Sequence, residues 1–225
     1  MSSSYNILNG ITGVVGIGLL ASVITWIVKY QSGFGWASSP DLEFNWHPFL
    51  MVLGLVFLYS QSILIYRTGR YHTSKKILKY AHALIHLIAF LCSIVGLVAV
   101  FDSHNRKGTP NMFSLHSWIG LITVITFALQ FVSGFVAFLF PGLSGFIRKL
   151  LMPYHVFFGT IAFIFAIITT VAGITEMVLW TDNFETKPPA VLLLNFMGLL
   201  AVVYGSMTVY LLLKPDYKRV PLPED

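Results

Sequence analysis

The stretch YAHALIHLIAFLCSIVGLVAVF (80–101) decides the fold class, because it contains no Asp, Glu, Lys or Arg. A membrane-spanning helix needs about 20 consecutive, mostly apolar residues, and this stretch satisfies that length. Strands of a membrane β-barrel alternate polar and apolar residues over about 10 positions, a pattern that is absent here. We therefore expect a transmembrane helix at this position.

Five further stretches of similar character occur along the chain. The six expected spans are 7–28, 46–66, 80–101, 115–140, 152–175 and 190–213. Of the 225 residues, 56% are hydrophobic and 10% are charged, against about 25% charged in ordinary soluble domains. The sequence therefore predicts an all-α, polytopic membrane protein. We expect one domain over residues 1–225, with spans two to five forming a core four-helix bundle.

The basic residues predict the orientation in the membrane. The side with both termini would hold ten Lys and Arg residues, and the other side would hold the remaining four. Basic residues gather on the cytosolic side, so we expect both termini to be cytosolic. The ten are Arg67, Arg70, Lys75, Lys76, Lys79, Arg148, Lys149, Lys214, Lys218 and Arg219. Because these basic residues lie at the ends of spans, where orientation signals belong, we do not expect nucleic acid as a partner. The sequence is compatible with location in the plasma membrane, a secretory vesicle membrane or an endolysosomal membrane.

Four histidines lie near the starts of four successive spans. A histidine inside a membrane is costly unless it faces a partner or a cavity. Spans two and four both enter from the outer side, so His47 and His116 lie at matching depths near that face. By the same argument, His82 and His155 lie near the inner face. The sequence predicts two pairs of imidazoles, each contributed by facing helices of one bundle.

Each predicted pair offers two imidazoles and no carboxylate. A structural zinc site uses four ligands, and a catalytic zinc site usually has three protein ligands. Two axial imidazoles instead suit a haem iron, whose other ligands come from the porphyrin. No CxxCH motif is present, so such haems would be held non-covalently, as haem b. We therefore predict two haem b groups that carry electrons.

His86 is an alternative to His82 as a ligand. It lies four residues later, on the same helix face, and so could replace His82 or join it in a metal pair. The other three spans carry their histidine at the very start, which favours His82. On that interpretation His86 is a hydrogen-bonding residue of the core, near the cofactor.

Three residues indicate where the helices begin. Ser114 is a good N-cap for the span at 115–140. Pro153 suits the first turn of the span at 152–175, where its missing N–H would be unbonded in any case. Pro48 is ambiguous, since it either opens span two or lies inside a helix that begins near Pro40.

At these residues the chain resembles the eukaryotic cytochrome b561 family, which are ascorbate-dependent transmembrane electron carriers. The resemblance covers spans two to five. It is carried by FNWHP (44–48), IYR (65–67), KYAHALIH (79–86), VAVFDSHN (98–105), SLHSW (114–118) and MPYHVFFG (152–159). The resemblance implies haem ligands at His47, His82, His116 and His155, in agreement with the pairing above.

The resemblance also implies sites at both faces. On the cytosolic side, the residues implied for ascorbate are Lys75, Lys79 and Arg148, and those implied for the inner haem are Arg67, Lys75 and Lys218. On the outer side, those implied for the outer haem are Asn111, Met112, Phe113, Ser114 and Glu176. His104 resembles a catalytic position that presents the electron acceptor. The alternatives are that the basic residues only set orientation and that His104 is a solvated loop residue.

The function implied by the resemblance is transmembrane electron transfer. Ascorbate would donate single electrons on the cytosolic side, and monodehydroascorbate or a ferric chelate would accept them on the other side. The resemblance also implies a homodimer embedded in membrane lipid. A histidine-lined metal transporter is the alternative, because histidines inside membranes also line ion paths. Against it, no carboxylate lies within the expected spans, and no pair of broken helices is evident.

Overall fold

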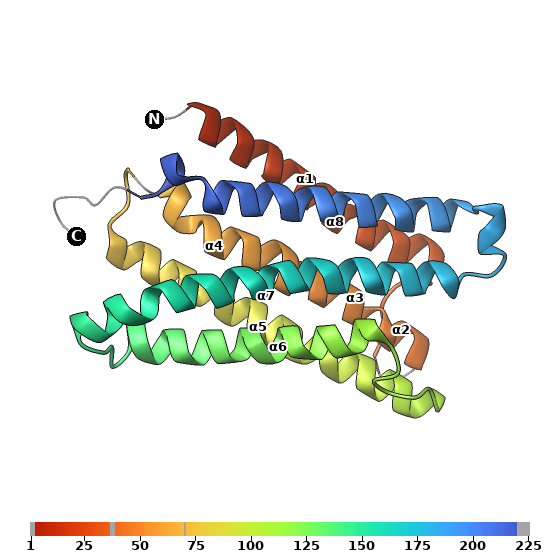
Figure 1. Ribbon diagram of the computed structural model, residues 1–225. Helices are drawn as coiled ribbons and strands as arrows, with labels where there is room; N and C mark the ends of the chain where they lie inside the picture. Colours follow the sequence, from red (N-terminus) through yellow and green to blue (C-terminus); the bar gives the residue numbers. More distant parts are fainter. Residues whose placement is uncertain (1–2, 37–38, 70, 220–225) are drawn as a thin grey trace.

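The computed structural model describes residues 3–36, 39–69 and 71–219, and within these ranges it contains helices and no strand (Figure 1). Six helices are long and apolar enough to cross a membrane, which confirms the predicted fold class. They are Ser4–Tyr30, Pro40–Thr68, Lys75–Lys107, Leu115–Leu139, Gly145–Leu179 and Pro189–Leu213. Arg70, one of the ten basic residues used for the orientation, lies outside the described residues.

Four of the six spans are single α-helices, and two contain a π-helical segment. The single helices are α1 (Ser3–Tyr30), α5 (Lys75–Lys107), α7 (Gly145–Leu179) and α8 (Pro189–Leu213). The second span is built from α2 (Pro40–Phe44), α3 (Trp46–Met51), the π-helix η1 (Val52–Leu58) and α4 (Tyr59–Thr68). The fourth joins α6 (Leu115–Gly134) to the π-helix η2 (Phe135–Leu139). Short 3-10 turns flank α8 at η3 (Phe184–Thr186) and η4 (Pro215–Tyr217).

Helix α6 begins as predicted. The Ser114 side chain accepts a hydrogen bond from the Ser117 backbone N–H, and the Ser117 side chain accepts one from the Ser114 N–H. This reciprocal capping satisfies two of the backbone donors that a helix start leaves open. Pro48 lies inside the helical stretch that begins at Pro40, which resolves the ambiguity about span two.

Helix α7 begins earlier than predicted. It starts at Gly145 behind Ser144, whose side chain accepts a hydrogen bond from the Ile147 N–H. Pro153 therefore lies inside the helix, and the prediction that it occupies the first turn of the fifth span is wrong. The reason is that apolar length marks only the part of a helix inside the membrane. The basic turn around Arg148 is also helical.

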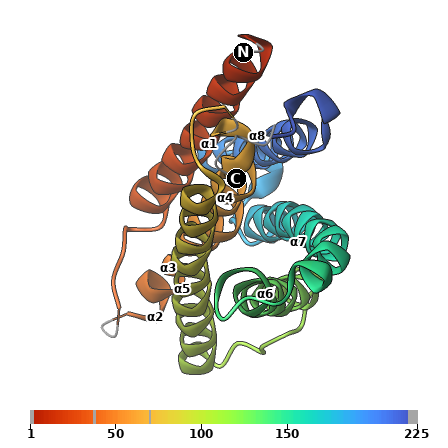
Figure 2. The same ribbon diagram turned by 90° about the vertical axis from the view of Figure 1, so that its left-hand side faces the viewer.

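The described chain begins at Ser3 and ends at Arg219 at one end of the bundle, which we call the termini end (Figure 1). The opposite end is called the distal end. Viewed along the bundle, spans two to five surround the centre, and α1 and α8 pack side by side against span two and α7 (Figure 2).

A buried apolar layer crosses the middle of the four-helix core. It consists of Leu55, Tyr59, Ala89, Val124, Phe127, Ala162, Phe163 and Ala166. In each of these four spans the expected haem-ligand histidine precedes the layer in sequence. Because neighbouring spans run in opposite directions, the histidines of spans two and four lie on one side of the layer. Those of spans three and five lie on the other side.

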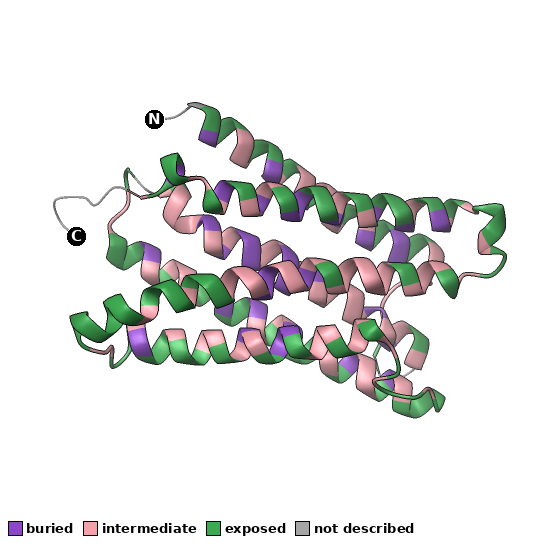
Figure 3. Ribbon diagram, viewed as in Figure 1, coloured by how far each residue is buried: buried purple, intermediate pink, exposed green. Residues whose placement is uncertain are grey.

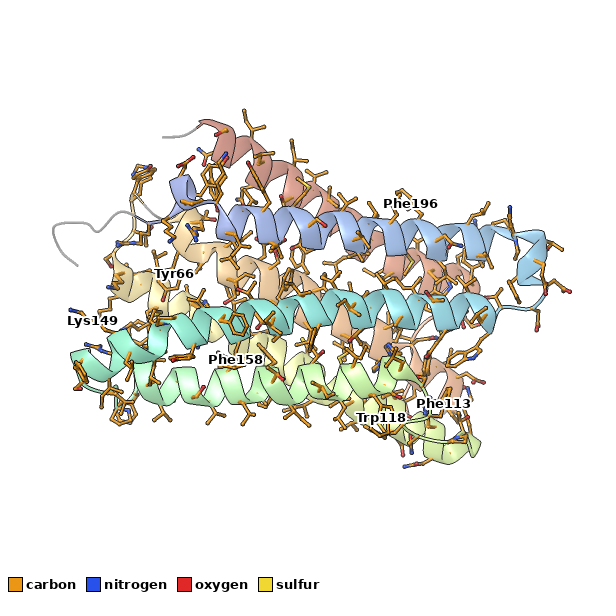
Figure 4. The ribbon with its side chains drawn as sticks, viewed as in Figure 1. Tyr66, Phe113, Trp118, Lys149, Phe158 and Phe196 are labelled. Carbon is orange, nitrogen blue, oxygen red and sulfur yellow. The ribbon has the colours of Figure 1, made fainter. Side chains whose placement is uncertain are left out.

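Exposed residues cover the outward side of the helices (Figure 3), and many of them are large and apolar. Val14, Leu115 and Phe146 have 71%, 72% and 80% of their surface exposed, and the labelled Phe158 and Phe196 point outward (Figure 4). Lipid solvates such side chains, whereas the helical backbone satisfies its own polar groups. The surface is that of a protein embedded in a bilayer.

Candidate functional site

The structure brings the four span-start histidines together as two pairs. His47 of α3 and His116 of α6 have ring centres 6.1 Å apart at the distal end, with their planes at 89°. His82 of α5 and His155 of α7 have ring centres 6.4 Å apart at the termini end, with their planes at 69°. The two pairs lie on opposite sides of the buried apolar layer.

Backbone carbonyls orient three of the four imidazoles. The Nδ1 atoms of His47, His82 and His116 lie 3.1, 2.9 and 2.9 Å from the carbonyl oxygens of Gly96, Ser62 and Thr169, respectively. A carbonyl oxygen only accepts, so each Nδ1 carries the proton and donates. In the neutral form of each ring Nε2 then carries the lone pair, which is the arrangement that a metal ligand requires.

Two glycines allow the rings of the fourth and fifth spans to approach the facing helix. A Cβ atom on Gly173 of α7 would lie 2.7 Å from Cε1 of His116, and one on Gly134 of α6 would lie 2.9 Å from Cε1 of His155. Both separations are too short for non-bonded carbon atoms. The His116 ring thus occupies the space beside Gly173, and the His155 ring occupies the space beside Gly134, because glycine has no side chain.

The ring geometry favours His82 over His86 as the partner of His155. His86 is buried at 8% exposure, and its ring is perpendicular to that of His82 at 4.5 Å. It also contacts the rings of Tyr59 and Phe127, at 4.8 and 5.4 Å. His86 therefore points into the apolar layer, one helical turn deeper than the pair. Its buried Nδ1 has no hydrogen-bond partner among the described residues, so the expected hydrogen bond is not observed at this atom.

Residues around the start of span two fix the position of His47. Asn45 donates hydrogen bonds from Nδ2 to the carbonyls of Gln31 and Gly33, at 2.9 and 2.7 Å. One turn before His47, the buried Glu43 carboxylate forms an ion pair with Arg106 of α5 at 2.6 Å. These contacts tie α2 to α5 and to the chain that follows α1.

A cavity at the distal end opens beside the distal histidine pair. Its lining includes His47 and His116, and also the residues that the resemblance implied for this end: His104, Asn111, Met112, Phe113, Ser114 and Glu176. The His104 ring stacks on Phe44 with centres 6.3 Å apart and planes at 8°. Trp118 donates a hydrogen bond from Nε1 to the Met112 carbonyl at 2.8 Å, close to Phe113 (Figure 4).

Basic residues gather at the termini end. Lys79 of α5 lies within electrostatic range of Lys75 and of Arg148 on α7. Arg67 donates a hydrogen bond from Nη2 to the Leu212 carbonyl at the end of α8. The Lys218 side chain, in the segment after η4, is exposed.

Comparison with known sequences assigns the chain to a family. Residues 46–181, which include all four paired histidines, match the profile described as eukaryotic cytochrome b561. The chain belongs to the eukaryotic cytochrome b561 family. With its six membrane-crossing helices, this cytochrome b561 is a multi-pass integral membrane protein.

Named relatives of this cytochrome b561 include three from animals. Transmembrane ascorbate-dependent reductase CYB561 of Mus musculus is 38% identical over 94% of this chain and 84% of the relative. A putative transmembrane ascorbate-dependent reductase CYB561 homolog of Caenorhabditis elegans is 38% identical over 98% of this chain and 87% of the relative. Plasma membrane ascorbate-dependent reductase CYBRD1 of Xenopus laevis is 41% identical over 90% of this chain and 74% of the relative.

A cytochrome b561 carries haem b, and the histidine pairs fit that group. An imidazole nitrogen lies about 2 Å from its metal and about 1 Å from its ring centre, so two imidazoles on one iron have centres about 6 Å apart. The observed separations of 6.1 and 6.4 Å agree with this value. Among the described residues no group of three or more His, Cys, Asp or Glu side chains is placed to hold a metal ion, so each pair offers two imidazoles only.

Several residues of the site were missed by sequence reasoning. The carbonyls of Ser62, Gly96 and Thr169 carry no sequence signal, because every residue has a carbonyl. Trp26 of α1 and Met197 of α8 line the distal cavity, so the site extends beyond the predicted four-helix core. Which face of an apolar helix turns inward depends on its neighbours, and sequence alone left that undecided.

Proposed function

We propose that this cytochrome b561 is a transmembrane oxidoreductase that takes single electrons from cytosolic ascorbate. It delivers them to monodehydroascorbate or ferric iron on the opposite side of the membrane. The relatives named as ascorbate-dependent reductases support the donor. The observation that carries the proposal is the presence of two histidine pairs at haem-ligand spacing, one at each end of the bundle.

The paired histidines would hold two non-covalent haem b groups, His47 with His116 and His82 with His155. When bound, each haem supplies an iron that alternates between the ferric and ferrous states. Because Nδ1 is committed to a carbonyl in three of the four rings, those imidazoles are oriented before the haem binds. A hydrocarbon core about 30 Å thick is too wide for one transfer, and a site near each face divides it into shorter steps.

At the termini end, which we propose to be cytosolic, Lys75, Lys79 and Arg148 would bind ascorbate. Ascorbate is a monoanion near neutral pH, and a group of cations on neighbouring helices raises its local concentration. Lys79 lies within electrostatic range of both Lys75 and Arg148, which supports a shared anion site. Arg67 would bind a carboxylate of the inner haem, because a guanidinium matches a carboxylate with two parallel hydrogen bonds.

At the distal end, Glu176 and the stretch Asn111–Ser114 would contact the outer haem. His104 would present the acceptor at the cavity mouth. His104 lies in the last turn of α5 and not in a loop, and its stacking on Phe44 supports a fixed orientation for the ring. The alternative function, a histidine-lined metal transporter, has less support, because neither histidine pair is joined by a third ligand among the described residues.

Ascorbate reduction in sealed proteoliposomes tests the proposal. The purified protein, replete with haem, is reconstituted with either ferric chelate or monodehydroascorbate inside, and ascorbate is added outside. We expect a Soret band, two haems per chain, rapid reduction by ascorbate, and loss of the trapped acceptor. A chain without haem, or haem that ascorbate leaves oxidised, would overturn the proposal. The relative rates with the two acceptors identify the preferred one.

A further inference from the structure

Trp26 of α1 forms part of the wall of the distal cavity. Its side chain is 1% exposed and belongs to the buried apolar cluster between α1, span two and α8. Several members of this cluster also line the cavity that contains the distal histidine pair: Val23, Trp26, Val52, Leu194 and Met197. Trp26 is the largest of them, so a helix outside the four-helix core contributes the bulkiest side chain of this wall.

The indole N–H of Trp26 is shielded from solvent and has no hydrogen-bond partner among the described residues. This N–H is the only hydrogen-bonding group of a tryptophan side chain, and buried polar groups almost always have a partner. The indole N–H groups of Trp46 and Trp118, by contrast, donate to the carbonyls of Gly35 and Met112 at 2.9 and 2.8 Å. Because the residues that share the cavity wall with Trp26 are all apolar, the occupant of the cavity is the remaining source of an acceptor.

The amide and carboxylate side chains that line the cavity lie at the distal end of the bundle. Asn111 belongs to the connection between α5 and α6, and Glu176 to the last turn of α7 (Figure 1). A carboxylate is costly to bury without polar partners, so the two carboxylates of haem b are expected at that end, near water. The buried wall around Trp26 would then meet the conjugated, apolar part of the haem. An aromatic ring system accepts a weak hydrogen bond from an N–H group.

We propose that Trp26 is a contact residue of the outer haem site, where its indole packs against the haem held by His47 and His116 and directs its N–H at the porphyrin. The contact gives the unpartnered donor an acceptor that the surrounding side chains do not supply. It also makes α1, a helix outside the four-helix core, part of the outer haem site. The inference rests on the proposed function, because it requires haem at the distal pair.

The test is a redox titration of the purified, haem-replete protein, followed by optical and electron paramagnetic resonance spectra that separate the two centres. The variants are Trp26→Phe, which keeps an aromatic ring but lacks the N–H, and Trp26→Leu, which also loses the ring. Ile27→Val is the matched control, because Ile27 is fully buried in the same cluster and is not among the residues that line the cavity. His116→Ala identifies the outer centre.

Trp26→Phe is expected to lower the midpoint potential of the outer centre alone, because the positive end of the N–H dipole favours the reduced haem. The expected change in the reduction equilibrium is about twofold to fivefold. This corresponds to about 20–40 mV at 59 mV per tenfold for one electron. Trp26→Leu should lower that potential at least as much or release the outer haem selectively, and Ile27→Val should leave both centres unchanged.

Nuclear magnetic resonance of the wild-type protein gives a second test that does not depend on how the Trp26 variants fold. Low-spin iron is paramagnetic when ferric and diamagnetic when ferrous, so the Trp26 indole N–H signal should move on reduction. It should move far more than the signal of Trp36, which is not among the residues that line the cavity. Replacing the other tryptophans one at a time assigns the signals.

An outer centre unchanged in both Trp26 variants, an equal change in Ile27→Val, equal shifts at both centres, loss of both haems from Trp26→Phe, or a Trp26 signal that does not respond to reduction would overturn the inference. A wild-type protein without two ascorbate-reducible haems would instead contradict the proposed function. The two failures are therefore distinguishable.

Discussion

A methyl group added at Gly173 is expected to weaken cofactor binding at the distal histidine pair alone. The Cβ of Gly173→Ala would lie 2.7 Å from Cε1 and 2.9 Å from Nδ1 of His116. Non-bonded carbon atoms prefer separations of about 3.5–4.0 Å, so the ring must retreat by about 1 Å. That movement pulls Nδ1 away from the Thr169 carbonyl, which it reaches at 2.9 Å.

The size of the effect follows from these two consequences. Overfilling a packed site costs about 1–3 kcal/mol, and the lost hydrogen bond costs about 1 kcal/mol. Together they amount to about 2–4 kcal/mol, which corresponds to about 30-fold to 700-fold weaker binding at 1.4 kcal/mol per tenfold. The pair at the termini end lies beyond the apolar layer and should keep its ligand geometry.

The assay is pigment stoichiometry together with the low-temperature optical spectrum of the purified variant. We expect the haem content to fall from two toward one per chain, with the spectrum of the remaining centre unchanged. Gly198→Ala is the control, because its Cβ would meet only Ile174 Cγ2 at 3.8 Å, an ordinary contact. Two haems with wild-type spectra in Gly173→Ala, or an equal loss in Gly198→Ala, would refute the reasoning.

Three further substitutions test other parts of the structure. His155→Ala removes one ligand at the termini end, so we expect one haem per chain with the distal spectrum intact; a pigment assay that still finds two would contradict the ligand assignment. Lys79→Gln removes a cation from the proposed ascorbate site, and the KM for ascorbate at low salt should rise about threefold to tenfold. An unchanged KM in steady-state reduction would remove the support for that site. Glu43→Gln breaks the 2.6 Å ion pair with Arg106 and should cost about 1.5–3 kcal/mol, at the lower end because Arg106 is 32% exposed. Thermal unfolding measures this cost, and Asp41→Asn, at a carboxylate that is 76% exposed, should have almost no effect.

The depth of each histidine could be predicted, but its rotation about the helix axis could not. Antiparallel spans place His47 beside His116 and His82 beside His155 in depth, whichever way each helix is turned. The direction of each ring depends on helix phase, and the π-helix η1 shifts the phase of span two between His47 and Tyr59. A regular 3.6-residue period therefore mispredicts which residues of that span face inward.

The sequence by itself determined the number of spans, the membrane environment and the depth of the four histidines. These follow from the length of the apolar segments, the positions of the charged residues and the direction of each span. Each of these can be read from one segment or from the order of the segments. Only the tertiary structure decided the carbonyls that orient His47, His82 and His116, and the glycines that admit His116 and His155. Those features are contacts between segments far apart in the chain, and their geometry is set by how the helices pack against one another.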